Sequence, residues 1–226
     1  MMPTSSIGRK LVMAATGQFM ILYAIAHLLG VSTFYTGGIN AYAEGLRRWP
    51  LSILLWLSRI FFISAVVIHM FFGIRLFIEN NASRPVEYIV KRRQSATFAG
   101  RTMIWTGLAI FAFIIFHIAH FTFHAIGTSL FSADGGGVSR QTDVLGIMRD
   151  AFQDPGTNAF YTASMTFLLI HLSHGIQSSL QTLGLSSGNL STLFMRGGTI
   201  FAVILSIGYA GIPIYVLADR LLLQPR

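Results

Sequence analysis

Long apolar segments alternate with short polar ones along almost the whole chain. Five apolar segments are long enough to cross the ~30 Å hydrocarbon core of a bilayer, which takes ~20 helical residues. They cover about residues 11–35, 50–78, 101–126, 157–182 and 197–218. The polar segments between them hold turn and loop residues, such as Gly37-Gly38 and the Gly135–Gly137 run. The pattern predicts an all-α membrane protein, with one transmembrane domain of five helices over residues 1–226.

Composition supports a bilayer as the solvent and narrows the available chemistry. The 226 residues are 53% hydrophobic and only 11% charged, whereas soluble domains carry about 25% charged residues. The chain has no Cys, which excludes disulfides, iron–sulfur ligation, thioether-attached haem and a Cys nucleophile. The seven His are therefore the chief side chains that could bind a transition metal or a haem iron.

The basic residues flank the apolar segments, so the net charge of +8 indicates membrane topology rather than nucleic-acid binding. Five spans place the N-terminus, residues 79–101 and residues 183–196 on one side. That side carries nine basic and two acidic residues, a net +7, and the other carries seven basic and six acidic, a net +1. Arg59 is one of the seven basic residues that this count assigns to the other side. Positive charge favours the cytoplasm, so we expect a cytoplasmic N-terminus.

All seven histidines lie in or at the end of a predicted helix: His27, His69, His117, His120, His124, His171 and His174. A His within a membrane is costly and indicates a function by default. The alternative for a single His is a hydrogen bond between helices. Because each of the first four helices offers at least one His, we favour a set of ligands.

Two local repeats sort four of these histidines. The first and third helices read TGQFMILYAIAH, ending at His27, and TGLAIFAFIIFH, ending at His117. The second and fourth read HMFFG, beginning at His69, and HLSHG, beginning at His171. A glycine one turn from a His lies on the same helix face and leaves room for a flat, wide group.

Depth in the membrane sorts the same four histidines into two layers. His27 and His117 lie ~24 Å along helices that run outward, which places them in the outer half. His69 and His171 lie late in helices that run inward, which places them in the inner half. We expect one bis-His iron site in each layer. Haem fits better than a bare metal, because neutral imidazoles are good axial ligands, no carboxylate accompanies them and the surrounding helices are apolar.

A zinc site is the competing prediction. It would use His117, His120 and His124, with His171 and His174, but no carboxylate for a bound water is obvious at that depth. Alternatively His120, His124 and His174 bond haem propionates, line a quinone pocket or face another helix. His124 is on the face of His117, ~10 Å further outward.

These residues resemble the single-chain, two-haem cytochrome b membrane anchor of succinate:quinone oxidoreductases, that is, of succinate dehydrogenase or quinol:fumarate reductase. The resemblance covers the first four helices. A fifth span with few characteristic residues is also consistent with it. It is carried by Thr16-Gly17 to His27, then Val31-Ser32-Thr33, by His69 with Arg75 six residues on, by Thr106-Gly107 to His117, and by His171 in HLSHG.

The resemblance implies functions for these residues and partners for the chain. It makes His27 and His117 the axial ligands of a distal haem b, and His69 and His171 those of a proximal haem b. It implies a flavoprotein subunit and an iron–sulfur subunit at the cytoplasmic face of a prokaryotic inner membrane. Electrons would pass between the iron–sulfur clusters, the two haems and a quinone, usually menaquinone, with no dicarboxylate active site in this chain.

The chain departs from some relatives at two acidic positions. Leu169 stands where they carry a Glu implicated in proton transfer, and Trp49 or Pro50 stands where they carry a Glu that serves the quinone. Glu44 is the nearest acid, and it is either a substitute or a solvated loop charge.

The roles of two basic residues and the identity of the enzyme complex each have alternatives. Arg75 and Arg101 are either propionate partners or cytoplasmic anchoring charges. The alternative function is the cytochrome b subunit of another membrane-bound enzyme, such as a hydrogenase or formate dehydrogenase. A cytochrome b of the bc type is disfavoured because it pairs ligands 13 or 14 residues apart on one helix, and a non-redox transporter is a third possibility.

Overall fold

The computed structural model describes residues 5–82, 97–126, 143–185 and 190–223, and their regular structure is entirely helical. The α-helices are α1 (Ser6–Val31), α2 (Ile39–Arg47), α3 (Leu51–Ala82), α4 (Phe98–His117), α5 (Val144–Gln153), α6 (Pro155–Thr182) and α7 (Leu190–Leu223). A 3₁₀ turn, Ser32–Thr36, follows α1, and a π-helical turn, Ile118–Thr122, follows α4.

Within the described ranges, four helical segments are long and apolar enough to cross a membrane: Ser6–Thr36, Leu51–Ala82, Phe98–Thr122 and Arg196–Leu222. The chain therefore has the character of a multi-pass membrane protein. The remaining long helix, α6, has 28 residues, but polar side chains such as Asn158, His174 and Gln177 lower its hydropathy. Its crossing, and with it the count of five spans, stays a prediction.

The structure corrects the sequence prediction at two polar segments. Residues 36–49 contain α2 and residues 127–156 contain α5, where only turns and loops were expected. Both helices are short and amphipathic, so a search for long apolar segments does not detect them. The predicted helix over 101–126 also ends early, at Thr122. The expected Gly135–Gly137 loop and part of the Leu183–Asn189 turn lie outside the described residues.

Side-chain caps fix where several helices begin. Ser5 accepts a hydrogen bond from the backbone N–H of Gly8 at the start of α1, and Thr97 accepts one from Gly100 at the start of α4. Asp154 caps α6, whose first residue is Pro155. Each cap satisfies a backbone donor that the first helical turn leaves unpaired.

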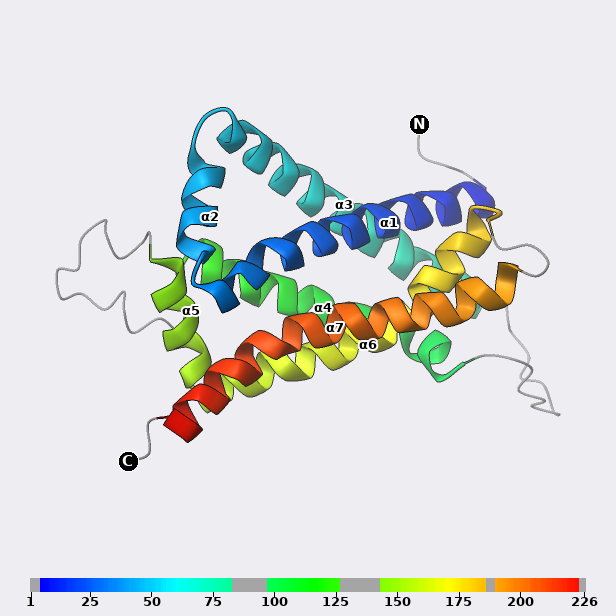
Figure 1. Cartoon of the computed structure of the whole chain (residues 1–226). Coiled ribbons are helices and arrows are strands. Elements are labelled where there is room, and N and C mark those ends of the chain that lie inside the picture. Colours follow the sequence, from blue (N-terminus) through cyan, green and yellow to red (C-terminus); the bar gives the residue numbers. More distant parts are fainter. Residues whose placement is uncertain (1–4, 83–96, 127–142, 186–189, 224–226) are drawn as a thin grey trace.

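The long helices run side by side, and the two short helices lie across one end of them (Figure 1). Helix α1 packs on α3 and α6, α4 packs mainly on α6, and α3 and α4 touch more sparsely, so these four form a ring. Helix α7 packs along α6 and also reaches α1. Diagonal partners in the ring are α1 with α4 and α3 with α6.

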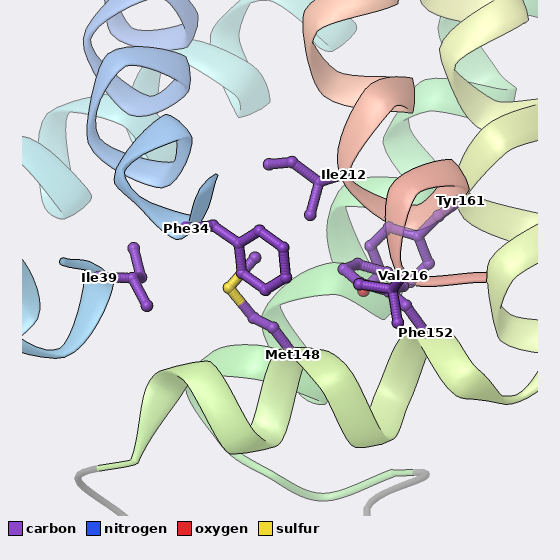
Figure 2. Close-up of a cluster of buried hydrophobic side chains, with 7 residues drawn as sticks. All are labelled: Phe34, Ile39, Met148, Phe152, Tyr161, Ile212 and Val216. Atoms are coloured by element: carbon purple, nitrogen blue, oxygen red, sulfur yellow. The ribbon is translucent and has the colours of Figure 1, made fainter. Parts of the chain in front are cut away.

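A buried apolar cluster closes the end of the ring that carries α2 and α5. It consists of Phe34, Ile39, Met148, Phe152, Tyr161, Ile212 and Val216, drawn in Figure 2. Two hydrogen bonds of Asn40 also connect the two short helices. Its amide nitrogen donates to Asp143 Oδ1 at 2.9 Å, and its amide oxygen accepts from the Leu145 N–H at 2.9 Å. This end of the bundle is therefore a capped, well-packed layer.

Arg59 is the ninth residue of α3, inside a segment able to cross a membrane. It lies within the predicted span over 50–78, although the charge count assigned it to the second side together with the loop charges.

Candidate functional site

Two pairs of histidines face one another across the ring. His27 of α1 and His117 of α4, the α1–α4 pair, have ring centroids 5.9 Å apart and ring planes at 73°. His69 of α3 and His171 of α6, the α3–α6 pair, have ring centroids 6.5 Å apart and planes at 65°. Each pair joins diagonal helices. The structure thus brings together the two pairs that motif and depth had sorted.

The separation within each pair suits an iron atom between the two rings. A metal lies about 2 Å from each imidazole nitrogen that binds it, so the centroids of two axial rings lie on the order of 6 Å apart. All four rings are only half-buried, so the described side chains do not fill the space beside them. The donor set, its spacing and this room fit a haem in each layer.

The two pairs lie at different depths in the bundle. Thr16, which contacts His69, precedes His27 by eleven residues on α1, and Thr106, which contacts His171, precedes His117 by eleven residues on α4. Eleven helical residues rise about 16 Å. The pairs therefore form two layers about 16 Å apart, the α1–α4 pair being nearer the end capped by α2 and α5.

In the α3–α6 pair, Nδ1 of each ring is held by a threonine hydroxyl and a backbone group. His69 Nδ1 lies 3.2 Å from Thr16 Oγ1 and 3.2 Å from the Met13 carbonyl oxygen. His171 Nδ1 lies 3.2 Å from Thr106 Oγ1 and also bonds the backbone of Met103. Carbonyl oxygens only accept, so Nδ1 carries the proton and Nε2 keeps its lone pair, which is the form of imidazole that can bind a metal.

In the α1–α4 pair, tyrosine hydroxyls, and not threonine hydroxyls, lie beside Nδ1 of each ring. Tyr209 of α7 lies 3.2 Å from His27 Nδ1 and donates its own proton to the Ala24 carbonyl at 2.7 Å. The phenol oxygen of Tyr209 therefore accepts from His27. Tyr161 of α6 lies 3.5 Å from His117 Nδ1. Within the described part of the chain, Nε2 has no hydrogen-bond partner in any of the four rings.

The contacts around the α3–α6 pair repeat with an internal symmetry. A Cβ on Gly17 would lie 3.4 Å from His69 Cε1, and one on Gly107 would lie 3.3 Å from His171 Cε1. Each Thr-Gly step of the sequence repeat thus lies against the His of the neighbouring helix. The unit of α1 and α3 and the unit of α4 and α6 present the same site twice.

The remaining histidines do not join either pair. His120 is fully buried, and its Nδ1 lies 3.0 Å from the Tyr161 hydroxyl. His174 lies against Gly100 at the start of α4. His124 lies beyond the α4 span, where burial and the positive charge of Arg47 lower the pKa of its imidazole. Among the described residues, no three His, Asp or Glu side chains gather to hold a bare metal ion, so the zinc alternative gains no support.

The charged candidates lie at the two ends of the bundle. Arg75 bonds Glu79 at 3.0 Å, and Glu79 also bonds Arg9 of α1 at 2.7 Å. Arg101 is exposed in the first turn of α4. Glu44 lies within α2 and not in a loop, and it forms an exposed ion pair with Arg48, four residues on, as a solvated surface charge would.

Sequence reasoning missed two tyrosines that contact the pairs, Tyr161 and Tyr209, and it gave Arg59 no role. The sequence contains a signal for Arg59 and Tyr161. Arg59 stands ten residues before His69, and Tyr161 stands ten residues before His171. Leu169 packs with the buried apolar side chains of α6 and α7.

Compared with protein-family models, with curated proteins and with solved structures, the chain matches none of them. Assignment of a function therefore depends on the residues and their geometry.

Proposed function

We propose that this chain is the di-haem cytochrome b membrane anchor of a succinate:quinone oxidoreductase. The observation that carries the proposal is the pair of opposed histidine couples, His27 with His117 and His69 with His171, in two layers. The two Thr-Gly motifs, which carry part of the resemblance, lie against the rings of His69 and His171. The glycines of the two His-x₃-Gly motifs lie near Met13 and Met103. Histidines that served only as hydrogen-bond partners between helices would not require this repeated arrangement.

The protein residues have three roles in this proposal. The four histidines would hold two haem irons through Nε2, and each haem supplies one-electron transfer when bound. Thr16, Thr106, Tyr161 and Tyr209 orient the rings and set how strongly each imidazole donates to the metal. The apolar side chains of the helices exclude water from the space around the pairs.

The path of the electrons follows from the proposed topology. The α3–α6 pair lies toward the end with the N-terminus, where the basic residues concentrate, so it would face the cytoplasmic iron–sulfur subunit and its flavoprotein partner. The α1–α4 pair lies nearer the opposite surface. In this scheme electrons pass through the two layers between the iron–sulfur subunit and a membrane quinone, with menaquinone the type that the resemblance favours. The membrane is a prokaryotic inner membrane.

The haem content of the purified chain tests the proposal. Pyridine haemochrome spectra should show two b-type haems per chain, and a His124→Ala variant should keep both because His124 lies outside the pairs. A chain that carries no haem when expressed in haem-replete cells would contradict the proposal.

Reduction in native membranes tests the identity of the complex. Succinate should reduce the haems there. Reduction by hydrogen or formate, but not by succinate, would instead assign the chain to another membrane-bound oxidoreductase.

A further inference from the structure

Arg59 places a permanent positive charge inside a membrane-spanning helix. It is the ninth residue of α3, about 12 Å along the helix from Leu51. A charged side chain at such a depth is costly and normally has a partner. Yet none of the ion pairs among the described residues includes Arg59, and no carboxylate of those residues bonds it.

The pairing of α1 and α3 fixes the depth of Arg59. These helices run antiparallel, with Thr16 beside His69 and Tyr23 stacked on Phe62 at 4.2 Å. Residue numbers therefore fall along α3 as they rise along α1, at the same rate. Extended by one more turn, this register places Arg59 level with His27.

The surroundings of Arg59 connect it to the α1–α4 pair. Its guanidinium lies 5.1 Å from the ring centroid of Trp56, one turn nearer the outer end of α3. It also acts electrostatically on the Tyr23 phenol, and the Tyr23 ring stacks on His27 at 6.4 Å. The cation therefore lies at the edge of the layer formed by His27 and His117.

We infer that Arg59 holds an anionic oxygen of the group bound between His27 and His117, namely a carboxylate side chain of its porphyrin. The inference rests on the proposed function. A guanidinium forms paired, charge-assisted hydrogen bonds with a carboxylate, and these are strong where water is excluded. Such a partner would offset the cost of Arg59 in the bilayer. A lipid headgroup phosphate offers the same chemistry, so the test must separate the two sources.

The test uses the full chain in membranes from haem-depleted cells, with a His69→Ala background that leaves only the α1–α4 pair. Iron protoporphyrin IX and its dimethyl ester, which lacks the carboxylates, are titrated by absorbance. With Arg59 present, the ester should bind about tenfold or more weakly than the free acid, as loss of a charge-assisted bond implies. Arg59→Gln should bind both porphyrins alike, and Arg59→Lys should keep part of the difference.

Two controls keep the result specific. Arg48→Gln removes an exposed cation of the same end, paired with Glu44, and should keep the full difference. In a His27→Ala background, which leaves the α3–α6 pair, Arg59→Gln should change nothing.

The outcomes that contradict the inference differ from those that contradict the proposed function. If the ester and the free acid still differ equally in Arg59→Gln, Arg59 does not hold the carboxylate, and a lipid phosphate is its partner. If the chain without substitutions binds no porphyrin, the proposed function fails and the inference fails with it.

Discussion

The phenol oxygen of Tyr209 lies 3.2 Å from Nδ1 of His27, although Tyr209 belongs to α7, outside the four-helix ring. Because the tyrosine proton goes to the Ala24 carbonyl, this oxygen accepts the His27 proton. Helix α7 therefore does more than cover α6, since it orients one of the four proposed iron ligands. A hydrogen bond of this kind makes the imidazole a stronger donor to a metal.

Replacing Tyr209 by Phe should raise the midpoint potential of the centre at the α1–α4 pair. The variant removes the acceptor while keeping the ring, so the oxidised iron is less stabilised. A hydrogen bond worth about 1 kcal/mol corresponds to on the order of 40 mV for a one-electron couple. A spectroelectrochemical titration measures this shift. Tyr215→Phe, on the same helix but remote from the histidines, is the matched control, and equal potentials in all three proteins would refute the role of Tyr209.

Substitution of Gly107 by Val should displace His171 and remove one centre. A Cβ at Gly107 already lies 3.3 Å from His171 Cε1, and the extra methyl groups of Val need further room in the ring. We expect the haem content to fall by about half, with the component of the α3–α6 pair lost. Gly197→Val is the control, because a Cβ there meets nothing within 4 Å. Full haem content in Gly107→Val would show that this contact does not matter.

Removal of the Glu79 charge should destabilise the protein more than removal of the Glu44 charge. Glu79 neutralises Arg9, whose side chain is only 11% exposed, whereas the partners Arg48 and Glu44 are 74% and 65% exposed. Glu79→Gln leaves Arg9 unpaired in a mostly buried position, which should cost about 1–3 kcal/mol. Glu44→Gln should cost at most about 1 kcal/mol. Thermal unfolding in detergent compares the two, and a larger effect of Glu44→Gln would contradict the description of this cluster.

The tie between α2 and α5 should weaken in acid. The Gly146 N–H and the Asn40 amide bond the Asp143 carboxylate and lower its pKa below the usual value. A lowered folded-state pKa means that the stabilisation is present above about pH 4 and is lost as the pH falls through the folded-state pKa.

Hydrogen exchange of residues 144–153, corrected for the intrinsic effect of pH, measures this loss. Asp143→Asn should exchange faster than the unsubstituted chain at pH 7, by about 1 kcal/mol of opening free energy, because a neutral amide accepts these hydrogen bonds less strongly than a carboxylate. The difference should shrink toward pH 3. Asp219→Asn serves as the control. A difference that stays constant with pH would show that the Asp143 charge is not responsible.

The sequence was sufficient for the positions of the long helices and for the sorting of the four histidines. Helical rise alone placed His27 and His117 in one layer and His69 and His171 in another, because depth depends only on counting residues along a helix. It could not supply the hydrogen-bond partners. Tyr209 reaches His27 from a helix 182 residues later in the chain, and only the packing of α7 against α1 brings them together.

The short helices and Arg59 were missed for a different reason. A criterion of ~20 apolar residues detects spans but passes over α2 and α5, whose apolar residues occupy one face of nine or ten residues. Arg59 was counted with the loop charges because charge counting assigns a residue to a side without asking how deep it lies. The ten-residue interval it shares with Tyr161 becomes meaningful only once α3 and α6 are seen as equivalent helices.

The pairing of the histidines is the central claim, and reduced-minus-oxidised spectra of four single His→Ala variants test it most directly. His27→Ala and His117→Ala should lose the same spectral component, and His69→Ala and His171→Ala should lose the other. The double variant of His27 and His117 should lose no more haem than either single variant. If His27→Ala and His117→Ala lose different components, or if the double variant loses both haems, the account of two paired layers is wrong.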